Sequence, residues 1–457
     1  MTDPVIVPRA EHPLSRQDID ADALKVLYRL HQFNHTAYLV GGSVRDLLLG
    51  RRPKDFDIGT SAHPYQIKKL FRNCWIIGRR FRLAHVKFGP KTIEVATFRR
   101  HVLPGTELEG ALKPDAEPPE GPGTVEAPDG AARHDNTFGT PEEDAFRRDF
   151  TINALFYDIG TFAIIDYVGG LQDLKDRVIR SIGDPNVRFP EDPVRMFRAI
   201  ALASRLDFTL DAEVVDAIER HRHLIASASP ARLIEEYYKV LRSGSAAKTF
   251  RMLAHHRLLE PVTPELQAGA ANTALWDSLE DLDTYRLRYD AAPPSMTNPI
   301  LLGSLLVPLG LMPTARHAGP EPPDDEAPPP ARAGRRRDRP KEPLLKIGAL
   351  PVARRDTERL RQILSMQRRL ADLDQSPRAR RALLHRGSFQ DAFTWFEIHG
   401  HNPPVLEHWK GFIEAAGVPG DGGPADGGAP PDGERRRRRR RGRRRRGGRR
   451  FHRPPEQ

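Results

Sequence analysis

Two aspartates separated by one residue, Asp55 and Asp57, are the side chains of this chain best suited to metal chemistry. The segment 55–58 alternates polar and apolar residues, which predicts a strand with both carboxylates on one face. Two carboxylates this close repel each other unless a cation lies between them, and Mg²⁺ is a hard cation that binds carboxylate and phosphate oxygens together. A lone Asp-x-Asp is also common on exposed strands, so the neighbouring residues have to decide between the two interpretations.

A glycine turn precedes the aspartates and adds the features of a phosphate site. Gly41 and Gly42 break the apolar run that ends at Val40, and such a turn can bring backbone N–H groups close to phosphate oxygens. Arg45 follows on a short helical segment and can donate several hydrogen bonds to an anion. The stretch 38–60 therefore predicts one site that holds both a triphosphate and the metal that activates it.

A third carboxylate, Glu94, lies in the segment 92–98, which also alternates like a strand. Its sequence neighbours Ile93 and Val95 are apolar, and a lone charge between apolar neighbours would be costly. If this strand pairs beside the aspartate strand, Glu94 joins the metal site. The alternative is an exposed glutamate on an edge strand.

A cluster of charges before the apolar segment 150–155 could contribute further contacts to a nucleotide. Arg147 and Arg148 could bind triphosphate oxygens, and Asp149 could contact the sugar or assist the metal site. Taken alone, the cluster is also typical of surface salt bridges at a helix end.

The segment Glu191–Arg195 predicts the start of a helix, because an acidic residue and a proline are favoured in the first turn. Residues Asp192, Arg195 and Arg198 are spaced by three and would share one helix face. Asp192 accepts and Arg195 donates, which is what reading a base edge by paired hydrogen bonds requires. The alternative is an ion pair that stabilises a surface helix.

Composition divides the rest of the chain into distinct segments. Residues 101–146 are rich in Pro, Gly and Glu without periodicity, which predicts a flexible loop or an insertion. Helical sequence dominates from 171 to 259. We expect an α+β fold in which an N-terminal head with a small mixed sheet precedes an all-helical neck, body and C-terminal segments and a disordered basic tail. The expected boundaries are an N-terminal arm at 1–21, the head at 22–168, the neck and body at 169–312, a low-complexity linker at 313–343, a C-terminal helical region at 344–416 and the tail at 417–457.

The positive charge is concentrated in the tail. The net charge is +11, but residues 434–457 contain fourteen Arg and two Glu, so the rest of the chain carries −1. Such a run cannot bury a core, and it is either a solvated segment without a partner or a non-specific RNA-binding arm. The single cysteine, Cys74, excludes a disulfide framework and fits a reducing cytoplasm. We find neither a signal peptide nor an apolar run of membrane-spanning length.

Three motifs together resemble those of the class II nucleotidyltransferases of the DNA polymerase β superfamily, which include the bacterial poly(A) polymerases and the CCA-adding enzymes. The motifs are the glycine–aspartate stretch 38–60, the sequence RRDFTINALFYD at 147–158 and E-D-x-x-R at 191–195. The resemblance implies a nucleotidyltransferase head and assigns catalysis to Asp55, Asp57 and Asp149, metal binding to Asp55, Asp57 and Glu94, and nucleotide binding to Gly41, Gly42, Arg45, Arg148, Asn153, Glu191, Asp192, Arg195 and Arg198.

Two further segments, Ile76–Val86 and Asp135–Asp144, are similar to those of the poly(A) polymerases. We therefore expect a template-independent RNA 3′-adenylyltransferase of mRNA polyadenylation and RNA turnover, which adds AMP from ATP with release of pyrophosphate. The resemblance implies two Mg²⁺ ions about 3.5–4 Å apart as cofactors. The expected partners are ATP and RNA 3′ ends, with the arginine tail as a non-specific RNA contact and no membrane. A CCA-adding tRNA nucleotidyltransferase and an inactive nucleotidyltransferase-like RNA-binding adaptor remain the alternatives.

Overall fold

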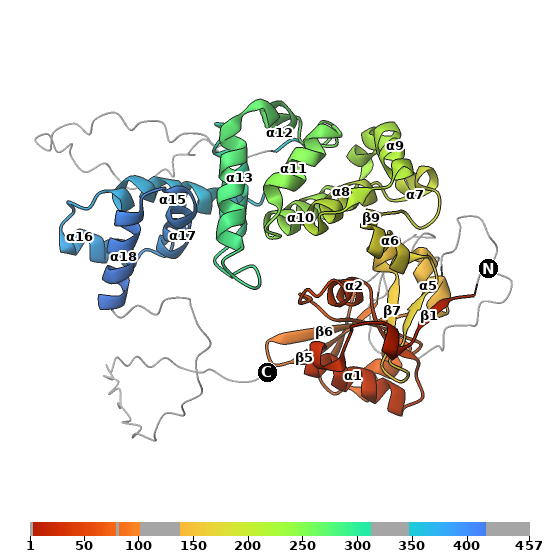
Figure 1. The fold of residues 1–457 in the computed structure, drawn as a ribbon. Coiled ribbons are helices and arrows are strands. Elements are labelled where there is room, and N and C mark those ends of the chain that lie inside the picture. Colours follow the sequence, from red (N-terminus) through yellow and green to blue (C-terminus); the bar gives the residue numbers. More distant parts are fainter. Residues whose placement is uncertain (1–2, 79–81, 101–137, 312–346, 417–457) are drawn as a thin grey trace, which may run out of the picture. The chain divides into compact units, whose positions relative to one another are not determined.

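A computed structural model describes residues 3–78, 82–100, 138–311 and 347–416 (Figure 1). Residues 1–410 form one compact unit, and the second unit, 411–457, is described only as far as residue 416. The expected linker 313–343 and the tail 417–457 lie outside the described residues. No helix in the described part of the chain combines the length and apolar character needed to cross a membrane.

The head is built on an eight-stranded sheet with the order β1-β8-β7-β2-β3-β6-β5-β4. Its strands are β1 (Val5–Val7), β2 (Ala37–Val40), β3 (Asp57–Thr60), β4 (Cys74–Ile77), β5 (Leu83–Phe88), β6 (Lys91–Thr97), β7 (Leu155–Asp158) and β8 (Ile164–Asp166). Strands β3 and β6 pair in parallel and the other neighbours pair antiparallel, so the predicted mixed sheet is confirmed. With eight strands it is larger than the small sheet expected.

Helices α1 (Ala21–Gln32) and α3 (Pro64–Leu70) cover one face of this sheet, since α1 contacts β2 and β3 while α3 contacts β4 and β5. Asp20 caps α1 by accepting from the N–H groups of Asp22 and Ala23. Leu27 and Leu30 of α1 are fully buried, as is Ile58 of β3. Burial of these apolar side chains fixes the register of the central strands, because a shift by one residue would turn them to the other face.

Among the described residues, a cluster that includes Val40, Phe98, Phe156 and Ala145 covers the β2-β7-β8 part of the other face. Ala145 belongs to α5 (Pro141–Arg147), which begins with a capping box between Thr140 and Glu143. The expectation of a flexible loop up to residue 146 is therefore wrong for residues 138–146; residues 101–137 lie outside the described part.

The polar arm expected at 1–21 is also partly wrong. Residues Val5–Val7 form β1, which pairs antiparallel with β8 and ends the sheet on that side. Strand β1 was not predicted because three residues are too few to show an alternation.

The neck and body are helical, as expected, apart from one short strand pair. Strand β9 (Val178–Ile179) pairs in parallel with β10 (Thr209–Leu210), which corrects the all-helical assignment of this part. The head contains the further helices α2 (Gly42–Leu48) and α6 (Gly170–Asp176). The helices of the neck and body are α7 (Pro185–Glu191), α8 (Val194–Leu206), α9 (Ala212–His221), α10 (Pro230–Leu241), α11 (Ala246–His255), α12 (Pro264–Ala268), α13 (Thr273–Arg286) and α14 (Asn298–Leu306).

The C-terminal helices are α15 (Arg354–Ala371), α16 (Pro377–Leu384), α17 (Phe389–His399) and α18 (Pro403–Ala415). Trp395 and Trp409 are buried, and the Trp409 indole donates to the Leu370 carbonyl at 2.9 Å. Trp395 lies so close to α14 that a Cβ on Gly303 would approach its ring to 2.4 Å. Only glycine permits this contact.

Candidate nucleotide and metal site

Three acidic residues, Asp55, Asp57 and Glu94, lie where β3 and β6 run side by side in the head, and we call them the acidic group. β3 begins at Asp57, so Asp55 precedes the strand and does not share its face as predicted. Ile58 pairs with Val95, which places Glu94 beside Asp57 on the same face. The sequence prediction that Glu94 lies beside the aspartate strand is therefore met.

The pKa of Asp57 is shifted by its surroundings, which include the other two acidic residues. Asp57 is exposed at the start of β3, yet the pKa of its carboxyl is raised to about 6, first by limited solvation among the neighbouring side chains and next by the negative charges of Glu94 and Asp55. Arg148 acts in the opposite direction, so its guanidinium lies near enough to attract the carboxylate. On the far side, His85 Nε2 lies 3.5 Å from Glu94 Oε1. A cation between these carboxylates would relieve their repulsion.

The donor set fits Mg²⁺, because all three side chains offer carboxylate oxygens. Among the described residues, no three His, Cys, Asp or Glu side chains are already arranged around one metal position. In phosphate sites, Mg²⁺ is usually bound by one or two carboxylates together with substrate phosphates. Asp57 and Glu94 are the best placed residues for that role, with Asp55 exposed beside Lys54.

Gly41 leaves room for Arg148 beside the acidic group. Gly41 has a φ of +73°, and a Cβ there would approach Arg148 Nη1 to 2.9 Å. Arg148 is held by Asp144, whose Oδ2 accepts from Nη2 at 2.9 Å, and by the carbonyl of Asn153 at 3.2 Å. The Gly41 N–H donates to the Leu155 carbonyl at 3.0 Å, so it is not available to a phosphate. The prediction that this N–H contacts a phosphate is therefore wrong.

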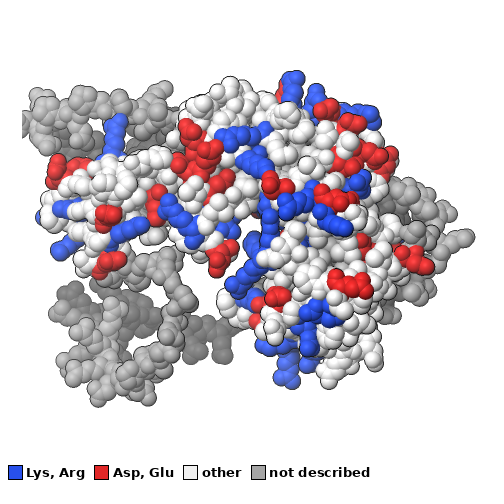
Figure 2. Space-filling model, viewed as in Figure 1, with Lys and Arg blue, Asp and Glu red and all other residues white. Residues whose placement is uncertain are grey.

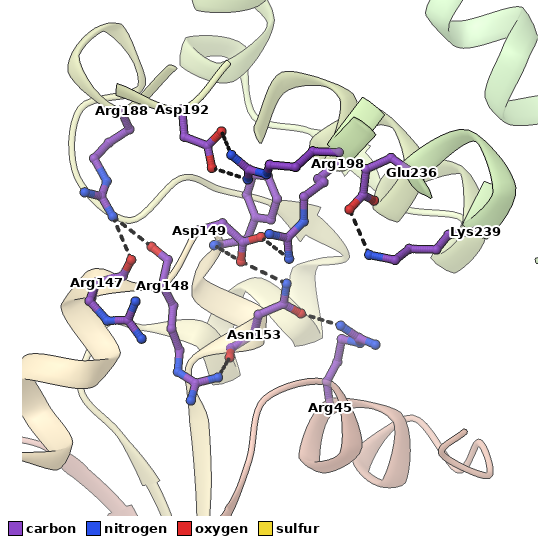
Figure 3. A network of polar contacts seen from close by, with 12 residues as sticks. Arg45, Arg147, Arg148, Asp149, Asn153, Arg188, Asp192, Arg198, Glu236 and Lys239 are labelled. Atoms are coloured by element: carbon purple, nitrogen blue, oxygen red, sulfur yellow. Dashed lines mark hydrogen bonds and ion pairs between the residues drawn. The ribbon is translucent and has the colours of Figure 1, made fainter. Parts of the chain in front are cut away.

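A chain of polar contacts joins helix α2 of the head to helix α8 (Figure 3). Arg45 donates from Nη1 to Oδ1 of Asn153, whose Nδ2 donates to Asp149 Oδ1 at 3.1 Å. The other oxygen of Asp149 lies 2.8 Å from Arg198 Nη2. The structure therefore brings together four predicted nucleotide-site residues from three distant parts of the sequence, although Arg45 is buried and already paired with Asp46.

Asp149 belongs to this series of polar contacts and not to the acidic group. Burial alone would raise its pKa, but the Arg198 guanidinium, the Asn153 amide and the Phe150 N–H hold the pKa below its usual range. Its carboxylate is therefore ionised and engaged by these three groups. This placement indicates that Asp149 positions α8 against the head, and its predicted catalytic role stays a prediction.

The E-D-x-x-R motif ends one helix and begins the next, so the predicted helix start is confirmed. Helix α7 ends at Glu191, Asp192 follows it, and α8 begins at Val194. Asp192 and Arg195 are not paired with each other: both oxygens of Asp192 accept from Arg232, at 3.2 and 2.8 Å. Arg195 Nη1 instead lies 3.4 Å from Glu191 Oε2.

Three residues that hold the site were missed by sequence reasoning: Asp144, Arg188 and Arg232. Arg188 is buried, pairs with Glu191 at 2.9 Å and donates to the carbonyls of residues 147 and 148 at 2.9 and 3.1 Å. Only Asp144 had a sequence signal, because it precedes Arg148 by four residues. Arg188 and Arg232 reach their partners across 40 or more residues, a distance that no local pattern reveals.

The described fold and the predicted site residues resemble those of a nucleotidyltransferase head. Residues 37–180 match the family described as Poly A polymerase head domain. Residues 207–269 match the family described as Probable RNA and SrmB- binding site of polymerase A, and residues 345–446 match Polymerase A arginine-rich C-terminus. The chain therefore belongs to the bacterial poly(A) polymerase-like nucleotidyltransferases.

Among its relatives, Poly(A) polymerase I of Salmonella typhi is 49% identical over 261 residues, which are 57% of this chain and 54% of the relative. The CCA-adding enzyme of Bacillus pumilus is 35% identical over 58% of this chain and 59% of the relative. The chain thus spans about half the length of these curated relatives. Among solved structures, the Bacillus stearothermophilus CCA-adding enzyme in complex with CTP is similar with a TM-score of 0.56 and 26% identity, over 86% of this chain and 82% of that chain.

Proposed function

We propose that this chain is a template-independent RNA 3′-adenylyltransferase that uses ATP and releases pyrophosphate, acting in the cytoplasm on mRNA and on RNA destined for turnover. The observation that carries the proposal is the 49% identity to Poly(A) polymerase I, against 35% to the CCA-adding enzyme of Bacillus pumilus. CCA addition remains the second candidate because the solved structure named above is a CCA-adding enzyme with CTP.

In this proposal, Asp57 and Glu94, with Asp55 beside them, hold Mg²⁺. The bound metal would activate the RNA 3′-hydroxyl and neutralise charge on the triphosphate. Arg148, next to Gly41, binds triphosphate oxygens by charge-assisted hydrogen bonds. The protein's contribution is positioning and charge stabilisation, and no covalent intermediate with the protein is needed.

The base of ATP would be read by the E-D-x-x-R motif. Arg232 fixes the orientation of Asp192, and Glu191 fixes that of Arg195. The acceptor Asp192 and the donor Arg195 are therefore oriented without pairing with each other. The polar chain through Asp149 then fixes α8, which carries Arg195, relative to the head.

Incubation of the purified chain with a generic RNA, or with a tRNA lacking its CCA end, and each single nucleoside triphosphate tests the proposal. We expect long additions from ATP on the generic RNA. Addition of two C from CTP alone, confined to the tRNA, would identify a CCA-adding enzyme. Binding of RNA without any addition would favour the adaptor.

Arg195→Ala should weaken the preference for ATP. Loss of a good bidentate base contact costs about 1–3 kcal/mol of discrimination, so the ratio of kcat/KM for ATP to that for the other nucleotides should fall accordingly. The control is Arg222→Ala, which removes an exposed arginine that contacts the Glu219 carbonyl outside the site. If the preference stays and only RNA affinity falls, Arg195 binds the RNA backbone instead.

Deletion of residues 434–457 should raise KM for RNA while leaving kcat at saturating RNA nearly unchanged. The rest of the chain carries a net charge of −1, and on the face seen in Figure 2 the basic side chains are interspersed with acidic ones. Each lost single-strand phosphate contact should reduce the slope of log K against log salt by about 0.7. Titrations with an unstructured RNA at several salt concentrations measure it. Equal affinities and slopes for both chains would refute an RNA-binding arm.

A further inference from the structure

A row of side chains crosses the sheet face that carries Asp57, from β3 to β4. In the strand register, Glu94 of β6 lies opposite His85 of β5, and His85 lies opposite Trp75 of β4. Residues directly opposite in antiparallel strands share a face, so the row continues from Asp57 through Glu94 and His85 to Trp75. Trp75 is three strands from Asp57, or about 14 Å at the usual strand spacing.

Trp75, at the end of this row, is a large aromatic side chain exposed to solvent. It is 51% exposed, and its neighbour on the same face, Ile77, is 46% exposed. The Nζ of Lys87 lies 5.1 Å from the centre of the Trp75 ring. An exposed aromatic ring with a lysine beside it offers a stacking surface for a base and a cation for its phosphate.

The geometry of the site indicates what approaches from this side. Arg148, the proposed triphosphate contact, lies beside Gly41 on the β2–β7 side of Asp57, and its guanidinium lies over the Phe156 ring of β7. In phosphoryl transfer the attacking and leaving oxygens are roughly in line on opposite sides of the phosphorus. The attacking RNA end therefore has to come from the β6-β5-β4 side, where Trp75 lies.

We propose that Trp75 and Lys87 form the binding platform for the 3′-terminal nucleotides of the RNA, with a base stacked on Trp75 and a phosphate paired with Lys87. This assignment rests on the proposed function and adds to it the place where the acceptor RNA is held. Stacking on a single ring requires only the flat face of a base, so the platform accepts any 3′ sequence. This tolerance suits an enzyme whose acceptor changes with each addition.

The test uses a short single-stranded RNA that carries the fluorescent base 2-aminopurine near its 3′ end, bound to the full chain without ATP. Trp75→Ala should weaken binding by about tenfold to a hundredfold and abolish the quenching of the fluorescent base. Trp75→Phe should keep much of both, because a ring remains. Lys87→Gln should reduce the salt dependence of binding by about one phosphate contact, a slope of roughly 0.7.

The matched control is Phe33→Ala, which removes another exposed ring, 47% exposed, that follows α1 on the helix-covered side of the sheet. It should change neither RNA affinity nor quenching. Unchanged affinity and quenching in folded Trp75→Ala would overturn the platform. A wild-type chain that binds and quenches this RNA but adds no nucleotide would instead contradict the proposed function and leave the platform standing.

Discussion

Asp57→Asn should reduce turnover by about 10³-fold or more while the chain stays folded, since preorganised charge at the reacting centre is worth this much. Asp57 is the central carboxylate of the acidic group, with Glu94 on the neighbouring strand and Asp55 just before it. Asparagine keeps the shape of the side chain and removes the charge that would hold the metal. Single-turnover addition of AMP to RNA at saturating ATP measures the loss.

The same substitution should raise stability in metal-free buffer. The folded chain raises the pKa of Asp57 from 3.8 to about 6, so the folded state binds this proton more tightly than the unfolded state does. The ionised carboxylate therefore destabilises the fold above pH 6, and this cost disappears as the pH falls toward 4. The melting temperature of Asp57→Asn should exceed that of the wild type at pH 8 and converge with it near pH 4.

Added Mg²⁺ should stabilise the wild type more than the variant, because a ligand stabilises the state that binds it. Asp277→Asn, an exposed aspartate in α13, is the control and should alter neither rate nor melting temperature. A folded Asp57→Asn protein with near-normal activity would exclude Asp57 from the catalytic site.

Arg198→Ala should lower the free energy of unfolding by about 3 kcal/mol, because it leaves the Asp149 carboxylate buried without its ionic partner. The Asp149 side chain is 8% exposed, whereas that of Arg198 is 43% exposed, so we expect the lower end of the range for a broken buried pair. Urea unfolding at pH 8 measures the loss. Arg251→Ala, which breaks an exposed pair with Glu280, should cost less than about 1 kcal/mol.

The pH dependence separates this cause from a simple packing defect. In the wild type, the lowered pKa of Asp149 contributes stability above pH 4 that is lost in acid. Without Arg198, burial raises the pKa, so the carboxylate destabilises the variant above its pKa and is relieved by protonation. The deficit should therefore be largest at neutral pH and narrow toward pH 4. A deficit that is independent of pH would show that Arg198 acts only through packing.

The sequence predicts the head well where local alternation and strand pairing agree. The position of Glu94 beside Asp57 follows from two alternating segments that pair as neighbours. The glycine turn is equally readable, since Gly41 adopts a positive φ that other residues avoid. The alternation and the turn have causes within a few residues, whereas the pairing of β3 with β6 joins distant segments and entered the prediction as a condition.

The sequence fails where the partners are distant. Asp192 and Arg195 have complementary charges and helical spacing, yet each is paired with another residue. Proline 193 ends one helix and begins the next, so the assumed common face does not extend to Asp192. The ion pair of Asp149 was not predicted for the same reason, because its partner Arg198 lies 49 positions further along the chain.

Strand β1 has a practical consequence for work with this protein. Residues Val5–Val7 occupy the backbone groups of β8 that would otherwise form the outer edge of the sheet. An unprotected edge is a template on which a second copy of the chain can add its own strand. Trimming the first eight residues would therefore favour edge-to-edge aggregation, whereas an affinity tag added ahead of them would leave this protection intact.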